Sequence, residues 1–421
     1  MLDPATGHDG EADVVIEHGR VTRVGRGAGD GLSGDGVRVV DARGRWVMPG
    51  LVDLHVHFRE PGQEYKEDIA SGLAAAAVGG FTTVCAMANT RPVNDTRAIT
   101  ETMVARAAEC GGTRLFPYGA ITKGLKGEEL TEMADLRQAG AIGLSDDGRC
   151  VMDSAVMRNA LEYARTFDLL VTQHCEDHHL TAGAEMHEGA RSTLLGLRGW
   201  PREAEDVIVA RDLILAERTG TRYHVAHISS AGAIRLLREA KSRGLRVSAE
   251  VTPHHLSLTD EALLTYDTHC KVNPPLRTEE DREALREALR DGTIDCVATD
   301  HAPHTTIEKD CEFSAASVGI NGLETALPVL LGLVRDGALT PLRLAEVTSL
   351  AAARLVPEIE AGGLRVGDRA DVTIVDPERR WTVSREALRS KSHNTPLLDR
   401  EVMGAVSMTL VAGEVVHERA D

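Results

Sequence analysis

Six side chains of metal-binding types lie at the C-terminal ends of short β-rich runs of this sequence. They are His55, His57, Asp147, His174, His227 and Asp300. A single histidine near the end of a strand is usually an ordinary polar residue, but four histidines and two aspartates gathered in one place could not be buried without a counter-ion. Imidazole and carboxylate groups suit Zn²⁺, with Mn²⁺ or Co²⁺ as substitutes. The sequence therefore predicts a metal site.

The spacing of His55 and His57 indicates how this site is built. Residues i and i+2 of a strand project from the same face, so both imidazoles can reach one ion. Six protein ligands exceed the three or four of a single open zinc site, which favours two ions about 3.5–4 Å apart with a shared bridge. Such a pair lowers the pKa of a bridging water and polarises a carbonyl, so the expected reaction class is hydrolysis.

The region from residue 50 to about 305 contains the elements that would bring these ligands together. Eight β-rich runs alternate there with helical stretches such as Ile69–Val78, Asp153–Phe167, Ala231–Ser242 and Thr278–Arg290, a pattern typical of parallel βα units. The runs are Gly50–His57, Phe81–Asn89, Arg114–Thr122, Ala141–Asp147, Leu169–Cys175, Arg222–Ile228, Arg246–Thr252 and Ile294–Asp300. Eight such strands predict an α/β fold of the (β/α)8 TIM-barrel type, whose chemistry lies at the C-terminal strand ends.

Both ends of the chain differ from this region. They carry short β-hairpin patterns, at Val14–Ile16, Val21–Val24, Val37–Val40, Ala370–Val375 and Val406–Glu418. The simplest arrangement is a small β-sandwich built from residues 1–50 and 363–421, interrupted by a barrel over residues 51–362. Because the chain opens on turn-like residues 3–7, a further strand is expected upstream of Met1. The Gly-rich stretch 25–36 is expected to form an exposed turn.

Composition limits the partners of the protein. The chain has 421 residues, of which 42% are apolar and 27% charged, within the globular range. Its 47 Lys and Arg against 65 Asp and Glu give a net charge of −18, which disfavours nucleic acid and anionic membranes. An anionic substrate would therefore need a local cation. No secretory leader or membrane-spanning stretch is evident, and seven scattered cysteines without a CxxC pair are typical of reduced thiols, so a cytoplasmic protein is expected.

Longer motifs surround the candidate ligands. The narrowest are His-Phe-Arg-Glu-Pro-Gly at 57–62, Ala-Asn-Thr at 88–90 and Val-Asn-Pro-Pro-Leu-Arg at 272–277; others lie at 173–177, 226–229, 252–256, 298–304 and 391–396. Together they resemble the amidohydrolase superfamily and, within it, the class I dihydroorotases. The resemblance covers nearly the whole chain.

The resemblance implies a role for each candidate residue. His55, His57 and Asp300 would bind one Zn²⁺, His174 and His227 a second, and Asp147 would bridge both together with a hydroxide. The implied substrate-binding residues are His57, Arg59, Asn89, Asn273, His304, Val318 and Gly319. Arg59 would hold the substrate carboxylate together with Asn89 and His304, and its planar guanidinium is the cation that an anionic substrate requires.

The implied reaction is the reversible opening of dihydroorotate, a small anion, to N-carbamoyl-aspartate in pyrimidine biosynthesis. The bridging hydroxide would attack the ring amide carbonyl and zinc would stabilise the oxyanion. Asp300 would take the proton from the nucleophile and pass it to the departing ring nitrogen. The sequence leaves open whether the chain forms a homodimer or associates with aspartate transcarbamoylase.

Two other functions compete with this interpretation. A hydantoinase or allantoinase would use the same scaffold, but such enzymes typically bridge their metals with a carboxylated lysine at the end of the fourth strand, and the run Ala141–Asp147 contains no lysine. An inactive dihydroorotase-like structural partner of aspartate transcarbamoylase would have lost metal ligands. Every expected ligand is present here.

Overall fold

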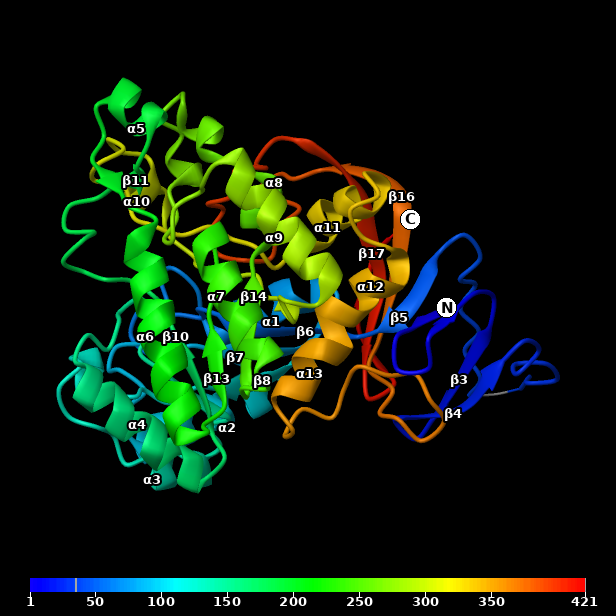
Figure 1. Cartoon of the computed structure of the whole chain (residues 1–421). Coiled ribbons are helices and arrows are strands. Elements are labelled where there is room, and N and C mark those ends of the chain that lie inside the picture. Colours follow the sequence, from blue (N-terminus) through cyan, green and yellow to red (C-terminus); the bar gives the residue numbers. More distant parts are fainter. Residues whose placement is uncertain (35, 421) are drawn as a thin grey trace.

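Two parallel sheets form the centre of the computed structural model, which describes residues 1–34 and 36–420 (Figure 1). One sheet has the order β6-β7-β8 and the other β15-β14-β13-β10-β9. Their strands are β6 (Leu51–Val56), β7 (Phe81–Ala86), β8 (Arg114–Pro117), β9 (Gly143–Ser145), β10 (Leu170–Gln173), β13 (Tyr223–Val225), β14 (Val247–Val251) and β15 (Cys296–Val297). Each of the eight predicted runs contains one of these strands, so the predicted alternation is confirmed.

The edges of the two sheets are connected by isolated parallel bridges. Val56 at the end of β6 is bridged to His301, which follows β15, and the His57 amide donates to the His301 carbonyl at 2.9 Å. Gly119, which follows β8, is bridged to Leu144 of β9. Both edges of the five-stranded sheet are therefore joined to the three-stranded one.

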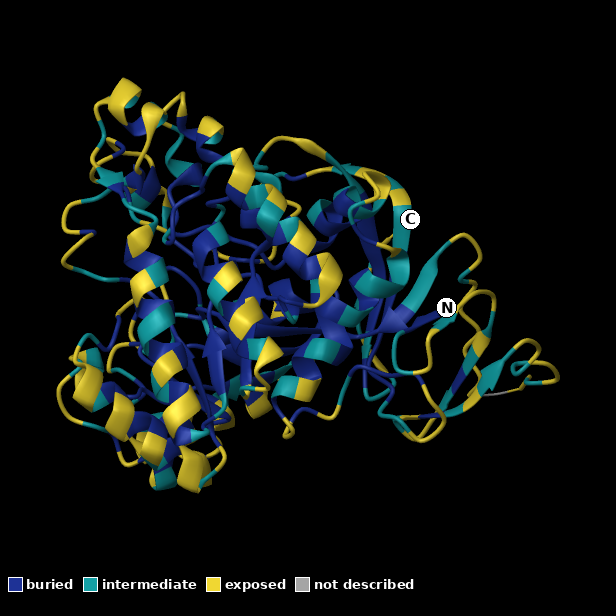
Figure 2. Ribbon diagram, in the orientation of Figure 1, coloured by how far each residue is buried: buried dark blue, intermediate teal, exposed yellow. Residues whose placement is uncertain are grey.

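Helices cover the outside of these sheets, and Figure 2 shows buried strands at the centre with exposed residues on the outer helix faces. The longer helices are α1 (Ile69–Val78), α2 (Arg97–Cys110), α3 (Met133–Ala139), α4 (Ser154–Thr166), α6 (Glu203–Thr219), α7 (Ala231–Ser242), α9 (Glu279–Asp291) and α11 (Ala326–Arg335). In α4 the buried residues Met157, Ala160, Leu161 and Ala164 follow the spacing of one helical face. All residues of β6, β7, β10, β13 and β14 are buried, as expected for parallel strands covered on both faces.

Side-chain caps fix where several of these helices begin. The Asp153 carboxylate accepts from the amides of Ala155 and Val156 at the start of α4. Thr278 and Asp281 form a capping box at the start of α9, and the first turn of this helix is acidic, which suits its N-terminal end. Each cap satisfies amides that the first helical turn leaves without a partner, and so sets where the chain leaves the preceding loop.

Shorter elements lie between the strands and helices. They are η1 (Lys123–Leu125), β11 (Met186–His187), α5 (Ala190–Leu195), β12 (Gly199–Trp200), α8 (Pro253–Ser257), η2 (Asp260–Leu263), η3 (Thr268–Cys270), α10 (Thr306–Lys309), α12 (Pro341–Ala345), η4 (Glu346–Leu350) and α13 (Ala351–Leu355). The segment containing β11, α5 and β12 is an excursion between β10 and α6 that the sequence analysis did not predict.

The two ends of the chain share one antiparallel sheet with the order β18-β17-β16-β5. Its strands are β5 (Trp46–Pro49), β16 (Val372–Thr382), β17 (Glu401–Val411) and β18 (Glu414–Glu418), and two further hairpins pair β1 (Leu2–Asp3) with β2 (His8–Asp9) and β3 (Asp13–Glu17) with β4 (Arg20–Gly25). In Figure 1 both ends of the chain lie on the side where this sheet is drawn. The prediction that the termini meet in a β-structure is confirmed by the pairing of Thr373 with Met48.

One predicted strand is wrong. Residues 37–40 have no strand pairing among the described residues, and Val39 is 80% exposed. A four-residue run of this kind needs a sheet edge to pair with, and here Arg38 contacts the Glu418 carboxylate through its side chain instead. The described part of the Gly-rich stretch, residues 25–34, consists mostly of turns, and residue 35 lies outside the described residues.

All seven cysteines are free thiols, as predicted. Within the described part of the chain, no helix has both the length and the apolar composition that a membrane span requires.

Candidate metal centre and active site

All six predicted ligands lie at the same end of the parallel strands, and all are buried. His55 belongs to β6 and His57 follows it directly. The other four come one to three residues after a strand end: Asp147 after β9, His174 after β10, His227 after β13 and Asp300 after β15. Since the carboxyl ends of parallel strands meet at one edge, the sheets bring together residues that are up to 245 positions apart in the sequence.

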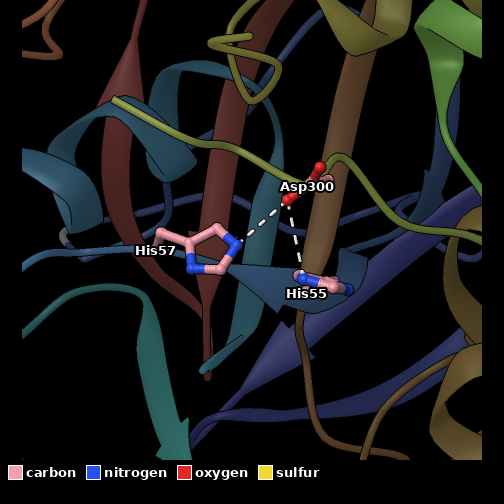
Figure 3. A group of neighbouring side chains, drawn as sticks. All are labelled: His55, His57 and Asp300. Atoms are coloured by element: carbon pink, nitrogen blue, oxygen red, sulfur yellow. Dashed lines mark hydrogen bonds and ion pairs between the residues drawn. The ribbon is translucent and has the colours of Figure 1, made fainter. Parts of the chain in front are cut away.

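Three of these side chains form a compact group, which Figure 3 shows. The Asp300 Oδ1 atom lies 3.0 Å from His57 Nε2 and 3.5 Å from His55 Nε2. Their ligand atoms all lie within 4.8 Å of one another, close enough to hold one metal ion.

The Asp147 carboxylate connects this group to the remaining histidines. Its Oδ1 atom lies 3.3 Å from His55 Nε2 and 3.4 Å from His227 Nε2, and its Oδ2 atom lies 3.4 Å from His57 Nε2. His174 Nδ1 is 3.0 Å from His227 Nε2 and 3.9 Å from Asp147 Oδ1. One carboxylate therefore faces four histidines from three different strands.

The hydrogen-bond partners of three histidines determine which ring nitrogen is free. His55 Nδ1 donates to Glu250 Oε1 at 2.6 Å, His57 Nδ1 to Asn89 Oδ1 at 2.9 Å and His174 Nε2 to Glu176 Oε2 at 2.8 Å. In a neutral imidazole the other nitrogen then carries a lone pair. These nitrogens face the cluster, and an outer hydrogen bond of this kind is typical of metal-binding histidines.

The centre of the cluster favours a positive charge. His55 Nε2 and Asp147 Oδ1 are buried, and neither has a hydrogen-bond partner. Leaving buried polar atoms unpaired costs about 1–3 kcal/mol each. Although burial lowers the pKa of His55, the carboxylates of Asp147 and Glu250 raise it well above its ordinary value. A divalent cation with imidazole and carboxylate ligands fits this arrangement.

Three residues at this edge adopt backbone conformations that side chains other than glycine rarely take. The φ angles of Arg59, His227 and Asp300 are 60°, 30° and 48°. Such conformations cost of order 1–3 kcal/mol and persist where the surroundings fix them. Here they coincide with two predicted metal ligands and the predicted substrate-binding arginine.

The residues predicted to hold the substrate carboxylate lie beside the cluster. The Arg59 guanidinium donates to the Pro303 carbonyl at 3.2 Å, and its Nη2 atom is 3.4 Å from His304 Nε2. Burial and the nearby Arg59 charge lower the pKa of His304 to about 3, so its imidazole is neutral. Asn89 contacts His57 through its Oδ1 atom and donates from Nδ2 to the Asp147 carbonyl at 3.3 Å.

Asn273, Val318 and Gly319 lie in the loops after β14 and β15. The Asn273 amide Nδ2 lies 2.9 Å from Glu176 Oε2 and 3.4 Å from His174 Nε2. Val318 is 45% exposed, and the Gly319 amide donates to the Lys271 carbonyl at 3.0 Å. Gly319 has a φ of +142°, and a Cβ atom there would come within 3.0 Å of Ala302 and His304. Only glycine therefore fits this position without displacing its neighbours.

A segment near the end of the chain holds these loops together. Asn394 accepts a hydrogen bond from the His304 amide at 2.9 Å through its side-chain oxygen. Its side-chain nitrogen donates to the carbonyls of Ala302 and Gly319 at 2.9 and 3.0 Å. The backbone that carries two predicted substrate-binding residues is thus fixed by one buried asparagine.

The carboxylates of Glu176 and Glu250 were not among the predicted site residues. Glu250 lies inside the fully buried strand β14, and its Oε2 atom also contacts His224 Nε2 at 3.2 Å. A charged residue in the middle of a buried strand is a signal that could have identified it. Glu176, two residues after His174, gives no comparable signal. Two further histidines follow Glu176 in this loop: His179 is exposed, whereas His178 is half-buried and accepts from the Cys150 amide.

Known proteins resemble this chain in sequence and in fold. A family model described as Dihydro-orotase-like matches residues 44–233. Dihydroorotases from Anaeromyxobacter dehalogenans strain 2CP-1 and Syntrophus aciditrophicus are 55% and 49% identical to it. Each alignment covers 99% of this chain, and they cover 96% and 97% of the respective relatives.

Two solved structures give the same picture for the fold. The L-hydantoinase (dihydropyrimidinase) from Arthrobacter aurescens superposes with a TM-score of 0.87 at 27% identity, covering 98% of this chain and 93% of its own. The dihydropyrimidinase from Brevibacillus agri superposes with a TM-score of 0.82 at 23% identity, covering 99% and 93%. The architecture is thus similar over nearly the whole length.

Proposed function

The chain belongs to the dihydroorotase family, and from this premise we propose that it catalyses the reversible hydrolysis of the cyclic amide of (S)-dihydroorotate to N-carbamoyl-L-aspartate, a step of pyrimidine biosynthesis in the cytoplasm. The observation that carries the proposal is the convergence of six buried histidine and aspartate ligands beside the Arg59 guanidinium. A metal-dependent hydrolase of an anionic cyclic amide needs both features, the ligands for the amide carbonyl and the cation for the carboxylate.

The proposed cofactor is a pair of Zn²⁺ ions. His55, His57 and Asp300 would hold one ion, His174 and His227 the second, and Asp147 would bind both. When bound, the ions supply Lewis-acid polarisation of the amide carbonyl and activate water as the nucleophile. The unpartnered His55 Nε2 and Asp147 Oδ1 atoms support this assignment.

Asp300 would move the proton in this reaction. It would accept the proton of the attacking water and deliver it to the ring nitrogen as the amide bond breaks. Burial raises its pKa, but the neighbouring imidazoles of His57 and His55 hold the pKa of Asp300 at about 2. The side chain is therefore a carboxylate near neutral pH, as a proton acceptor must be.

The architecture proposed for this activity is a (β/α)8 barrel over residues 51–362 with a small β-sandwich formed by residues 1–50 and 363–421. The two bridges between the parallel sheets and the pairing of β5 with β16 support it. The formation of a homodimer by this chain, and its association with aspartate transcarbamoylase, remain predictions.

A direct test of the activity compares substrates. The enzyme loaded with zinc is expected to hydrolyse dihydroorotate much faster than hydantoin or allantoin, measured as kcat/KM for each. The solved relatives named as hydantoinases make a hydantoinase the second candidate. A higher kcat/KM for hydantoin or allantoin would favour that candidate over dihydroorotase, and no turnover of any of the three would contradict both.

Arg59→Met is expected to raise KM for dihydroorotate while leaving the metal content unchanged. The substitution removes a charged partner of the substrate carboxylate but no metal ligand. Loss of one member of a buried charge pair costs about 2–5 kcal/mol, or about 30- to 4,000-fold in binding. Steady-state kinetics and metal analysis of the same sample check this. An unchanged KM would remove Arg59 from the substrate site.

Metal assembly is expected to be independent of bicarbonate. A bridging carboxylated lysine has to capture carbon dioxide, whereas the Asp147 carboxylate is part of the chain and is held in its charged form: burial raises its pKa, but His55 and His227 keep that pKa well below the ordinary value. Apo-protein reconstituted with zinc in the presence and absence of bicarbonate should recover equal metal content and activity. A clear bicarbonate requirement would overturn the assignment of Asp147 as the bridge.

A further inference from the structure

Glu176 lies between a proposed metal ligand and a proposed substrate contact. It follows His174 by two residues in the loop after β10 and is buried. Its Oε2 atom is 2.8 Å from His174 Nε2 and 2.9 Å from Asn273 Nδ2. One carboxylate oxygen therefore accepts hydrogen bonds from both residues.

The contact between Glu176 and His174 determines which ring nitrogen of His174 carries the lone pair. With Nε2 protonated and bonded to Glu176, the lone pair of the neutral ring lies on Nδ1. That nitrogen faces His227 and Asp147. His55 and His57 present Nε2 to the cluster and bind their outer partners through Nδ1. The ring of His174 is oriented the other way, with Nε2 toward its outer partner and Nδ1 toward the cluster.

The second carboxylate oxygen prevents Glu176 from rotating. Its Oε1 atom accepts from the Thr181 hydroxyl and lies 3.5 Å from His178 Nδ1. Thr181 is buried as well. With both oxygens engaged, the Oε2 atom stays where His174 and Asn273 meet it.

We propose that Glu176 is a positioning residue that couples metal binding by His174 to substrate binding by Asn273. The substrate half of this inference rests on the proposed dihydroorotase function, whereas the metal half depends only on the cluster. Without the carboxylate, His174 is free to turn its ring and Asn273 loses the acceptor that orients its amide. Zinc affinity then falls because the contact with His174 is lost, and KM rises because the contact with Asn273 is lost.

The test is a double-mutant cycle with Glu176→Ala and Asn273→Ala, alone and combined. Zinc affinity is measured on apo-protein by competition with a chelator, without substrate, and KM for dihydroorotate is measured at saturating zinc. Glu176→Ala should lower zinc affinity about 10- to 100-fold in both backgrounds. It should raise KM several-fold, on the order expected for one lost hydrogen bond, but only when Asn273 is present. Asn273→Ala should raise KM without changing zinc affinity.

Two further variants separate positioning from a general effect on folding. Glu176→Gln keeps the volume of the side chain and an oxygen that can accept from both partners, so it should restore most of the zinc affinity and the KM. Asp177→Asn is the matched control: Asp177 caps the amides of His179 and Leu180 in the same loop through an oxygen that asparagine retains, and both measurements should stay at the wild-type value. The visible spectrum of the cobalt-loaded protein should change in Glu176→Ala and not in Asp177→Asn.

Unchanged zinc affinity in Glu176→Ala, an equal rise in KM with and without Asn273, or a Gln variant as defective as the Ala variant would each overturn the inference. Failure of the proposed function has a different signature. A wild-type protein that binds zinc but does not turn over dihydroorotate contradicts the function, and the zinc-affinity measurements then decide the inference alone.

Discussion

Asp147→Ala is expected to lose metal at both proposed positions and to lower kcat/KM by on the order of 10³-fold or more. Its two oxygens lie 3.3–3.4 Å from the nitrogens of three histidines on two different strands, so both ions would lose a shared ligand. Metal catalysis of this type contributes several kcal/mol, and each 1.36 kcal/mol corresponds to about tenfold in rate. Metal content per chain and kcat/KM, measured on the same preparation, check this result.

The neighbouring Asp146 provides the matched control. Its carboxylate points away from the cluster and accepts from the amides of Ile121 and Thr122 at 2.7 and 3.0 Å. Asp146→Ala should therefore lower the free energy of unfolding by about 1–3 kcal/mol, because it leaves these buried amides unpaired. The folded variant should keep its metal. Loss of metal in the Asp146 variant, with normal metal content in Asp147→Ala, would contradict the assignment of the bridge.

Asp300→Asn is expected to lower kcat by about 10²- to 10⁴-fold, the contribution assigned to general acid–base catalysis. The amide keeps an oxygen near His57 but cannot accept a proton near neutral pH. Zinc content is expected to fall far less than in Asp147→Ala. Pre-equilibration with zinc before the assay ensures that the measured rate is that of the loaded variant.

A variant with full zinc content and a near-normal rate would show that another group carries the proton. A variant without zinc would show that Asp300 acts chiefly as a ligand. The pH profile adds a second readout, because the acid limb of kcat/KM that reports the Asp300 carboxylate should disappear in Asp300→Asn.

Much of the site was predictable because its parts are local. The two-residue spacing of His55 and His57 on a strand identifies them as candidates. Asp147, His174, His227 and Asp300 each lie at the end of a β-rich run. The parallel arrangement of the strands brings these residues together, because it places all such strand ends at one edge. The position of each helix was likewise predictable where caps and apolar spacing agree, as at Thr278 and in α4.

The rest depends on contacts between segments that no local pattern connects. The Glu250 carboxylate reaches His55 across 195 positions, and nothing near His55 specifies that partner. The excursion with β11, α5 and β12 packs Met186 with Leu276 and Phe313, from loops far along the chain. Residues 37–40 show the reverse case: the local alternation favours a strand, but no partner strand among the described residues pairs with it.

The three hydrogen bonds of the Asn394 side chain have a consequence for how the protein is made. They fix the loop of His304 and Gly319 from a position 75 residues beyond Gly319. During translation all the strands of the parallel sheets, with every proposed metal ligand, leave the ribosome well before Asn394 does. A nascent chain can thus bring its proposed metal ligands together before the loop of its proposed substrate pocket is fixed.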